Sequence, residues 1–285
     1  MATIWIDGEW HTRETAKVSV FDHGLLYGDG VFEGIRVYAG KVFKLQEHLD
    51  RIYECAHAIM LAIPIPKAEF GRVIEEAVRR AGMAEAYIRP IVTRGPGDLG
   101  IDPRNCGRPT VIVIVDAINI WSPERYAQGL SVITAGTPIP HRESLSPRIK
   151  SLNYLCHAMA KMEANFAGAD EALMLDSSGH VAEGTGQNVF VVKKNVLRTP
   201  PLSAGILAGI TRGVVMELAR QAGHTVVEDM LNRFDVYTAD EAFLTGSASE
   251  IAPIRCYDGR DIGSGKAGPV TRDLMARFTA YARAS

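Results

Sequence analysis

The sequence predicts an α+β fold in two domains, and three observations lead to this expectation. Short segments of β-type composition alternate with longer segments of helical periodicity. No repeat and no long polar or Pro/Gly-rich linker interrupts the pattern. The chain has 285 residues, and a typical domain has about 150. We place the domains at residues 1–120 and 129–285, joined by a linker at residues 121–128.

The first domain is expected to begin with strands and to continue with two amphipathic helices. The strands are the segments Thr3–Ile6, Lys17–Phe21, Val31–Tyr38 and Val42–Lys44, with Ala39 and Gly40 as the turn between the last two. The helices follow from two apolar faces, Leu49, Ile52, Ala56 and Met60 and then Phe70, Ile74, Ala77 and Val78, the second ending at Gly82. Two strands, Ala86–Thr93 and Thr110–Val115, complete the domain.

The second domain repeats the alternation of strands and helices. The expected elements are a strand at Leu130–Ala135, a strand carrying Arg148–Lys150, a helix over Tyr154–Phe166, hairpin turns at Asp176–Gly179 and Lys193–Asn195, and a helix over Thr211–Ala222 that ends at Gly223. In a chain of two domains, the cleft between them is the default place for a ligand.

The composition excludes several classes of protein. Hydrophobic residues make up 47% and charged residues 22% of the chain, which excludes disordered, collagenous and coiled-coil proteins. The 31 Lys and Arg residues nearly balance the 33 Asp and Glu residues, so the formal net charge is -2. Overall charge therefore attracts the chain neither to nucleic acid nor to a membrane surface, and a small-molecule partner is expected.

Short signals in the sequence bear on location and metal binding. The N-terminus lacks the pattern of a signal peptide, and the strongest apolar run, Val111–Val115, is too short to span a bilayer. A cytoplasmic location is therefore expected. The four cysteines form no C-x-x-C pair, and the eight histidines show no ligand-like spacing. We expect reduced thiols and no metal site.

Two turns in the second domain are candidate anion sites. Gly205–Arg212 places glycines before a predicted helix, whose first N–H groups are unpaired and whose dipole is positive at that end. An ordinary helix N-terminus capped by Thr211 explains the segment as well. Leu244–Glu250 is small and rich in hydroxyl groups, but a tight turn with Glu250 in a capping pattern is an equal alternative. Together the two turns fit one small ligand with more than one anionic group.

Lys150 and Glu183 are candidates for chemistry on a carbonyl group and on a ring. Arg148 would share a strand face with Lys150, and a neighbouring cation together with partial burial favours the neutral amine that attacks an aldehyde. A surface lysine on a strand is the alternative. Glu183 lies among glycines, where a flat ring can approach the backbone, and it either holds a ring nitrogen protonated or begins a turn.

Seven short motifs occur in an order that is typical of one enzyme family. They are Tyr27–Arg36, His48–Arg51, Tyr87–Pro90, Lys150–Leu155, Glu183–Asn188, Gly209–Arg212 and Gly246–Ile251. In this order the chain closely resembles the fold type IV pyridoxal-phosphate aminotransferases, and within them the branched-chain amino acid aminotransferases. The resemblance covers nearly the whole chain.

The resemblance implies a role for each cofactor-binding residue. Lys150 would bond the aldehyde of pyridoxal 5′-phosphate as a Schiff base and later carry the proton between the substrate and the cofactor. Glu183 would keep the pyridine nitrogen protonated, and Tyr154 would bond the phenolic oxygen. The remaining cofactor contacts, mostly to the phosphate, would come from Arg51, Leu207, Ile210, Thr211 and Ser247.

The resemblance also implies a substrate site and an assembly. The substrate carboxylate would lie near Ser247, Ala248 and Tyr87, and Tyr27, Phe32 and Trp121 would line an apolar pocket. Arg89 would pair with the distal carboxylate of 2-oxoglutarate. After Trp121 the family's usual tyrosine has no sure counterpart, and Arg94–Gly100 is a distinct Gly-rich loop. Since such a loop of a partner subunit closes the site in this family, at least a homodimer is implied.

The expected reaction is a ping-pong transfer of nitrogen from L-leucine, L-isoleucine or L-valine to 2-oxoglutarate. Other members of the fold are the alternatives, because Gly263–Thr271 and Val37–Phe43 resemble D-amino-acid aminotransferases, and (R)-amine transaminases and aminodeoxychorismate lyase share the cofactor chemistry. Tyr154 and Tyr87–Arg89 favour L-branched-chain substrates. A binding protein without catalysis would leave Lys150, Glu183 and Arg51 together unexplained.

Overall fold

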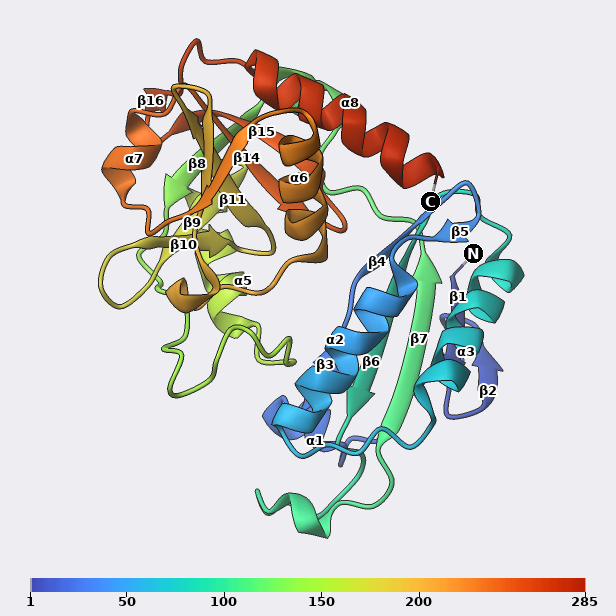
Figure 1. Cartoon of the computed structure of the whole chain (residues 1–285). Helices are drawn as coiled ribbons and strands as arrows, with labels where there is room; N and C mark the ends of the chain where they lie inside the picture. The colour runs from blue at the N-terminus through green and yellow to red at the C-terminus, as the bar shows by residue number, and fades with distance from the viewer. Residues whose placement is uncertain (1, 285) are drawn as a thin grey trace. The chain divides into compact units, whose positions relative to one another are not determined.

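The computed structural model describes residues 2–284 and divides them into two compact units, which are described separately (Figure 1). Unit 1 comprises the described residues up to Ile118 together with Ile149–Asn153, and unit 2 comprises Asn119–Arg148 and Tyr154–Ala284. Mixed strands and helices build both units, which confirms the α+β prediction. In the part of the chain that the structure describes, no helix is long and apolar enough to cross a membrane.

Unit 1 is built on an antiparallel sheet with the strand order β2-β1-β7-β6-β4-β5, and β3 pairs with β6. The strands are β1 (Thr3–Ile6), β2 (Glu9–His11), β3 (Gly30–Phe32), β4 (Ile35–Tyr38), β5 (Lys41–Val42), β6 (Ala86–Thr93) and β7 (Thr110–Asp116). Ala39 and Gly40 both have positive φ angles, as the predicted tight turn between β4 and β5 requires.

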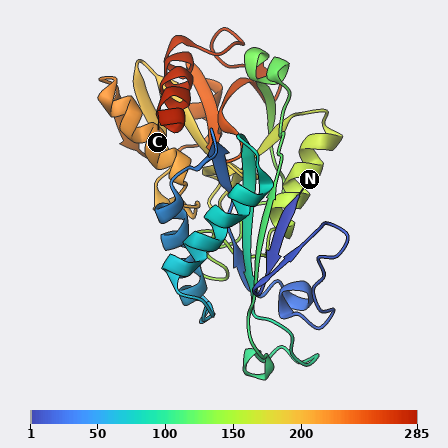
Figure 2. The same cartoon turned by 90° about the vertical axis from the view of Figure 1, so that its right-hand side faces the viewer.

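Two long helices pack side by side on the sheet of unit 1 (Figures 1 and 2). They are α2 (Leu45–Ala58) and α3 (Lys67–Ala81), and α1 (His23–Tyr27) and the short η1 (Pro103–Asn105) complete the unit. Phe70 and Ile74 of α3 are fully buried in one apolar cluster with Ile88 and Val113 of the sheet. Gly82 ends α3 with a φ angle of 61°, as the sequence predicts.

Unit 2 contains a sheet that closes on itself. The strand order is β10-β9-β8-β15-β14-β11-β12-β13, and a further pairing between β10 and β11 completes a ring. The strands are β8 (Leu130–Thr134), β9 (Glu171–Leu175), β10 (Val181–Gly184), β11 (Asn188–Lys193), β12 (Val196–Thr199), β13 (Thr225–Glu228), β14 (Glu241–Gly246), β15 (Glu250–Tyr257) and β16 (Arg260–Asp261). Both predicted hairpins, β9–β10 and β11–β12, are confirmed.

Helices cover the ring of unit 2 from outside. They are α4 (Pro123–Gln128), α5 (Leu155–Phe166), η2 (Leu202–Ala204), α6 (Ile210–Gln221), α7 (Arg233–Tyr237) and α8 (Pro269–Ala284). α5 packs on β9, and α6 packs on both α8 and β14 (Figure 1). Buried apolar residues such as Val189, Leu244 and Ala252 form the core.

Two predicted strands are wrong. Lys17–Phe21 is a loop in which Val18, Val20 and Phe21 are exposed, because no neighbouring strand pairs with it and the Ser19 hydroxyl binds the Phe21 N–H locally. Arg148–Lys150 also lies outside any strand, and a single bridge joins Ser151 to Val31. The expectation that Arg148 and Lys150 share a strand face therefore fails.

Smaller differences concern element boundaries. The strand predicted at Val31–Tyr38 is interrupted at Glu33 and Gly34, because the Glu33 side chain turns into the interior of unit 1. Met60 lies beyond the end of α2 and is exposed. Residues 121–128 contain α4 and belong to unit 2, since the Tyr126 hydroxyl donates to the Ser249 carbonyl there.

Candidate functional site

The predicted site residues fall into both units. Unit 1 contains Tyr27, Phe32, Arg51, Tyr87, Arg89 and Lys150. Unit 2 contains Trp121, Tyr154, Glu183, Leu207, Ile210, Thr211, Ser247 and Ala248. Each group has its own geometry.

Lys150 is fixed by its backbone, although it lies outside any strand. The Phe32 N–H donates to the Lys150 carbonyl over 3.0 Å, and the Lys150 N–H donates to Cys55 Sγ over 3.3 Å. The Lys150 ammonium nitrogen lies 4.6 Å from the centre of the Phe32 ring. Phe32 and Lys150 therefore form one local cluster within unit 1.

Arg89 joins the same cluster from β6. Its guanidinium carbon lies 4.8 Å from the centre of the Phe32 ring and 5.5 Å from that of Tyr87, and its Nη2 donates to the Tyr87 hydroxyl over 3.2 Å. Tyr87 and Arg89 are two residues apart on one strand, so both side chains reach the same face. The structure thus brings Phe32, Tyr87, Arg89 and Lys150 together.

Gly34 makes room for the Tyr87 hydroxyl. A Cβ atom at position 34 would lie 1.8 Å from that oxygen, so a larger residue is excluded unless Tyr87 moves. Tyr27 has a different environment, because its hydroxyl donates to the Leu99 carbonyl in the Gly-rich loop over 2.5 Å.

Arg51 belongs to a buried ion-pair cluster. Arg51 Nε and Nη2 donate to the two carboxylate oxygens of Glu33 over 2.6 and 2.8 Å, and His48 Nδ1 lies 2.8 Å from Glu33 Oε2. Glu33 and His48 are each 1% exposed. Burial alone would raise the pKa of Glu33, but Arg51 and His48 hold it well below its usual range. Burial also lowers the pKa of His48, against the pull of Glu33.

Sequence reasoning missed Glu33 as a partner of Arg51. A carboxylate inside the apolar segment Val31–Tyr38 is the signal that was available, because an ionised group in a buried strand requires a cationic partner.

Glu183 is the centre of the polar group in unit 2. Its carboxylate accepts hydrogen bonds from Asn188 Nδ2 over 3.2 Å and from the Leu207 N–H over 3.1 Å. His157 Nε2 lies 3.9 Å from Glu183 Oε1. The side chain is buried, so these donors hold the acid in a single position.

Asn188 links Glu183 to the turn that precedes α6. Its Nδ2 also donates to the Leu207 carbonyl over 3.0 Å, and a Cβ atom at Gly209 would lie 2.0 Å from Asn188 Oδ1. Gly209 occupies the N-cap position of α6 without a side-chain cap, and Ile210 and Thr211 begin the helix. The side-chain cap considered for Thr211 is therefore not formed, and the first N–H groups of α6 have no partner from a cap.

The end of β14 and the turn that follows it contain two unsatisfied hydroxyl groups. Thr245 Oγ1 and Ser249 Oγ are buried and have no hydrogen-bond partner among residues 2–284. Ser247 and Ala248 lie between them and are partly exposed. A buried hydroxyl without a partner costs about 1–3 kcal/mol, so this turn is suited to an acceptor such as an anion.

Trp121 contacts Tyr126, whose hydroxyl group donates to the Ser249 carbonyl in this turn. The two rings meet edge to face at 5.9 Å, and Trp121 Nε1 donates to the Asp170 carbonyl over 3.4 Å. Tyr126, in the segment that follows Trp121, thus joins the Trp121 ring to the Ser249 carbonyl.

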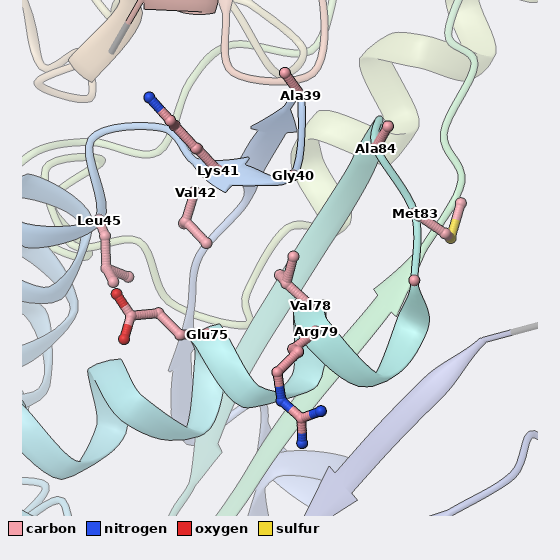
Figure 3. A pocket seen from close by; sticks show the side chains of 11 residues that line it. Ala39, Gly40, Lys41, Val42, Leu45, Glu75, Val78, Arg79, Met83 and Ala84 are labelled. Atoms are coloured by element: carbon pink, nitrogen blue, oxygen red, sulfur yellow. The ribbon is translucent and has the colours of Figure 1, made fainter.

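Two cavities lie away from these residues. One, of about 700 Å³, lies between β5 and α3 in unit 1, and Figure 3 shows Val42 and Val78 pointing toward each other while Lys41 and Arg79 point away. The other, of about 230 Å³, lies in unit 2 and is lined by residues that include His141, Arg142 and His180. Neither is lined by a predicted site residue.

Comparisons by family pattern, by sequence and by structure find the same kind of protein. The sequence pattern of the family described as amino-transferase class IV matches residues 30–257. Proteins named branched-chain-amino-acid aminotransferase from Pseudomonas aeruginosa and Escherichia coli K12 are 40% and 35% identical, each over 96% of this chain and 91% of its own length. The crystal structure of a T.th. branched-chain amino acid aminotransferase with pyridoxamine 5′-phosphate has a TM-score of 0.95 and 37% identity, covering 99% of this chain and 94% of that one.

Proposed function

Since this chain belongs to the class IV aminotransferases, we propose that it uses pyridoxal 5′-phosphate to transfer the amino group of L-leucine, L-isoleucine or L-valine to 2-oxoglutarate. The names of its relatives support the branched-chain substrates, and the pyridoxamine phosphate in a similar crystal structure supports the cofactor. The observation that carries the proposal is the pair of unsatisfied hydroxyl groups at Thr245 and Ser249, beside Ser247.

The residues of unit 2 fit the polar groups of such a cofactor. An anionic phosphate would supply the acceptor that the turn between β14 and β15 lacks, and the uncapped N-terminus of α6 offers N–H groups of Ile210 and Thr211 to the same kind of group. The buried Glu183, held by Asn188 and Leu207, suits a protonated ring nitrogen. Tyr154 would bond the phenolic oxygen.

Lys150 and Arg51 would add the aldehyde partner and a further phosphate contact from unit 1. Lys150 and Tyr154 belong to one motif of the sequence, four residues apart.

The cofactor, when bound, supplies an electron sink for the charge left when the substrate α carbon loses its proton. Glu183 would hold a proton on the ring nitrogen, which an ionised carboxylate favours. Lys150 would be the general base that takes the proton from the substrate α carbon and later gives it back. The proposed order of substrates is a ping-pong scheme, in which the amino group would stay with the enzyme between the two half-reactions.

Substrate side chains would be held by the cluster around Phe32 and by residues near Trp121. Phe32, Tyr27 and Trp121 supply apolar surface, and Tyr87 with Ser247 and Ala248 would hold the α-carboxylate. Arg89 is suited to the second carboxylate of 2-oxoglutarate, because its Nε is buried without a hydrogen-bond partner among residues 2–284.

We also propose that the protein forms a homodimer or a higher homo-oligomer. Large apolar side chains of unit 1 are exposed near α1 and in the Gly-rich loop, including Val20 (68%), Leu25 (63%) and Leu99 (70%). These segments are linked, because the Gly97 N–H donates to the Phe21 carbonyl. Such a patch is typical of an interaction surface, and sedimentation equilibrium measures the assembly.

The decisive experiment is a panel of half-reactions on the holoenzyme. Loss of its visible cofactor band is followed with L-leucine, L-glutamate, D-alanine and (R)-1-phenylethylamine. We expect a response to the first two, and no band at all in Lys150→Ala. A response to the last two only would assign the chain to the D-amino-acid or (R)-amine transaminases of the same fold, and the absence of a band in the wild-type protein would contradict the proposal.

A further inference from the structure

His157 is a buried residue of unit 2 that sequence reasoning did not single out. It lies in the first turn of α5, three residues after Tyr154, and is 7% exposed. The imidazole stacks on the Tyr154 ring, with the ring centres 4.3 Å apart and the planes at 17°. The spacing of three residues at the start of a helix places the two rings on one side.

The Nε2 edge of the same imidazole faces Glu183. His157 Nε2 lies 3.9 Å from Glu183 Oε1, which is beyond hydrogen-bond length, so the interaction is electrostatic. On the opposite side, His157 Nδ1 lies 3.3 Å from Cys156 Sγ. One side chain therefore contacts Tyr154, Glu183 and Cys156.

The neighbours of His157 decide which ring nitrogen carries the proton. Burial, together with the Glu183 carboxylate, raises the pKa of the Cys156 thiol, so the thiol keeps its proton and its S–H can donate a hydrogen bond to Nδ1. An ionised carboxylate only accepts, and a lone pair on Nε2 would be repelled by it. Nε2 therefore carries the N–H that faces Glu183.

We propose that His157 is a positioning residue that couples Tyr154 to Glu183. The flat stack restricts the Tyr154 ring to one orientation, and the Nε2–H attracts the Glu183 carboxylate electrostatically, in addition to the hydrogen bonds from Asn188 and Leu207. The inference rests on the proposed function, in which these two residues bond the phenolic oxygen and the ring nitrogen of the same cofactor.

Two substitutions separate the two contacts. His157→Phe keeps the stacked ring and removes the N–H that faces Glu183, whereas His157→Gln removes the ring and keeps an N–H group. His224→Phe is the matched control, because His224 lies in the turn before β13. The holoenzymes are compared by the dissociation constant of pyridoxal 5′-phosphate, by the pH midpoint of the visible band and by the unfolding temperature.

We expect His157→Phe to move the pH midpoint by about half a unit, a ~threefold change in the protonation equilibrium, and to weaken cofactor binding about three- to tenfold. His157→Gln should weaken binding with little change of the midpoint, and His224→Phe should change neither.

Two results would overturn the inference. One is a midpoint and a dissociation constant that stay at wild-type values in both His157 variants. The other is a lower unfolding temperature with an unchanged midpoint in His157→Phe, because that pattern describes a purely structural residue. A wild-type protein without a band that depends on Lys150 would instead remove the proposed function itself.

Discussion

Two buried polar groups, one in each unit, differ in how far the protein satisfies them. In unit 1 both oxygens of the buried Glu33 carboxylate have partners in Arg51 and His48, and only the outer nitrogen of that cluster, His48 Nε2, has none among residues 2–284. In unit 2 the buried hydroxyl groups of Thr245 and Ser249 have no hydrogen-bond partner among residues 2–284. The difference predicts that the paired carboxylate and the unpaired hydroxyl groups respond differently to mutation.

The paired Glu33 carboxylate should matter for the stability of the apoprotein. Glu33→Gln leaves Arg51 without a charged partner in the interior, and breaking a buried ion pair in this way costs about 3–5 kcal/mol. Denaturant unfolding of the apoprotein measures the loss. Glu76→Gln, on an ion pair at the surface of α3, is the control and should change little. A Glu33→Gln protein as stable as wild type would break the comparison.

Arg89 of unit 1 resembles the hydroxyl groups of Thr245 and Ser249, because its buried Nε has no hydrogen-bond partner among residues 2–284. Arg89→Ala should lower kcat/KM for 2-oxoglutarate more than kcat/KM for 4-methyl-2-oxopentanoate, since only 2-oxoglutarate has a second carboxylate. A hydrogen bond to a charged group contributes roughly 1.5–3 kcal/mol, so kcat/KM for 2-oxoglutarate should fall about tenfold or more relative to the branched acid. Equal losses on both acids would count against this role.

Removing the unpaired hydroxyl groups of Thr245 and Ser249 should not destabilise the apoprotein, but it should destabilise the cofactor-bound protein relative to wild type. Thr245→Val combined with Ser249→Ala removes unsatisfied groups that cost about 1–3 kcal/mol each. The apoprotein should therefore be as stable as wild type or more stable, whereas cofactor affinity should fall. Thr199→Val is the control, because that hydroxyl is buried in the same unit but donates to the Val189 carbonyl over 2.8 Å. Calorimetry measures the melting temperature of the apoprotein and of the holoenzyme. An apoprotein of the double variant that is less stable than wild type would show that these hydroxyl groups are not left for a ligand.

The smallest expected effect is on the stability of the folded protein at acidic pH. Because the pKa of Glu33 is lowered in the folded protein, its contribution to stability is complete above its unfolded value of about 4.3 and falls as the pH drops toward the folded value. The stability difference between wild type and Glu33→Gln should narrow below that pH by up to about 1.4 kcal/mol per pH unit. Urea unfolding at a series of pH values measures it, and a gap that widens in acid would show that the sign is wrong.

Local patterns in the sequence predict elements whose partners are also regular. β1 and β6 begin and end where their apolar alternation indicates, and Gly82 ends α3 as expected. The strand expected at Lys17–Phe21 has a similar composition, but alternation carries no information on whether a neighbouring strand is present to pair with it. Pairing depends on segments that are distant in the chain.

The same limit applies to the candidate site. The order of the motifs located Lys150, Glu183 and Arg51, because each of them lies in a short and recognisable segment. Their roles stay predictions. Glu33, Asn188 and His157 were missed as partners, since each acts through a contact that depends on the fold. His157 and Tyr154 are three residues apart, which indicates that their rings are neighbours. The proximity of His157 to Glu183, which lies on β10, cannot be predicted from the sequence.

The ring of unit 2 closes at the residue pair Glu183 and Asn188, which face each other across β10 and β11. The carboxylate and the amide that holds it are therefore only five residues apart in the chain, on two strands that pair with each other. Because β10 also pairs with β9 on its other side, the sheet itself fixes the place of the Glu183 carboxylate. Amide deuterium uptake along β10 should follow opening of the whole ring rather than local fraying.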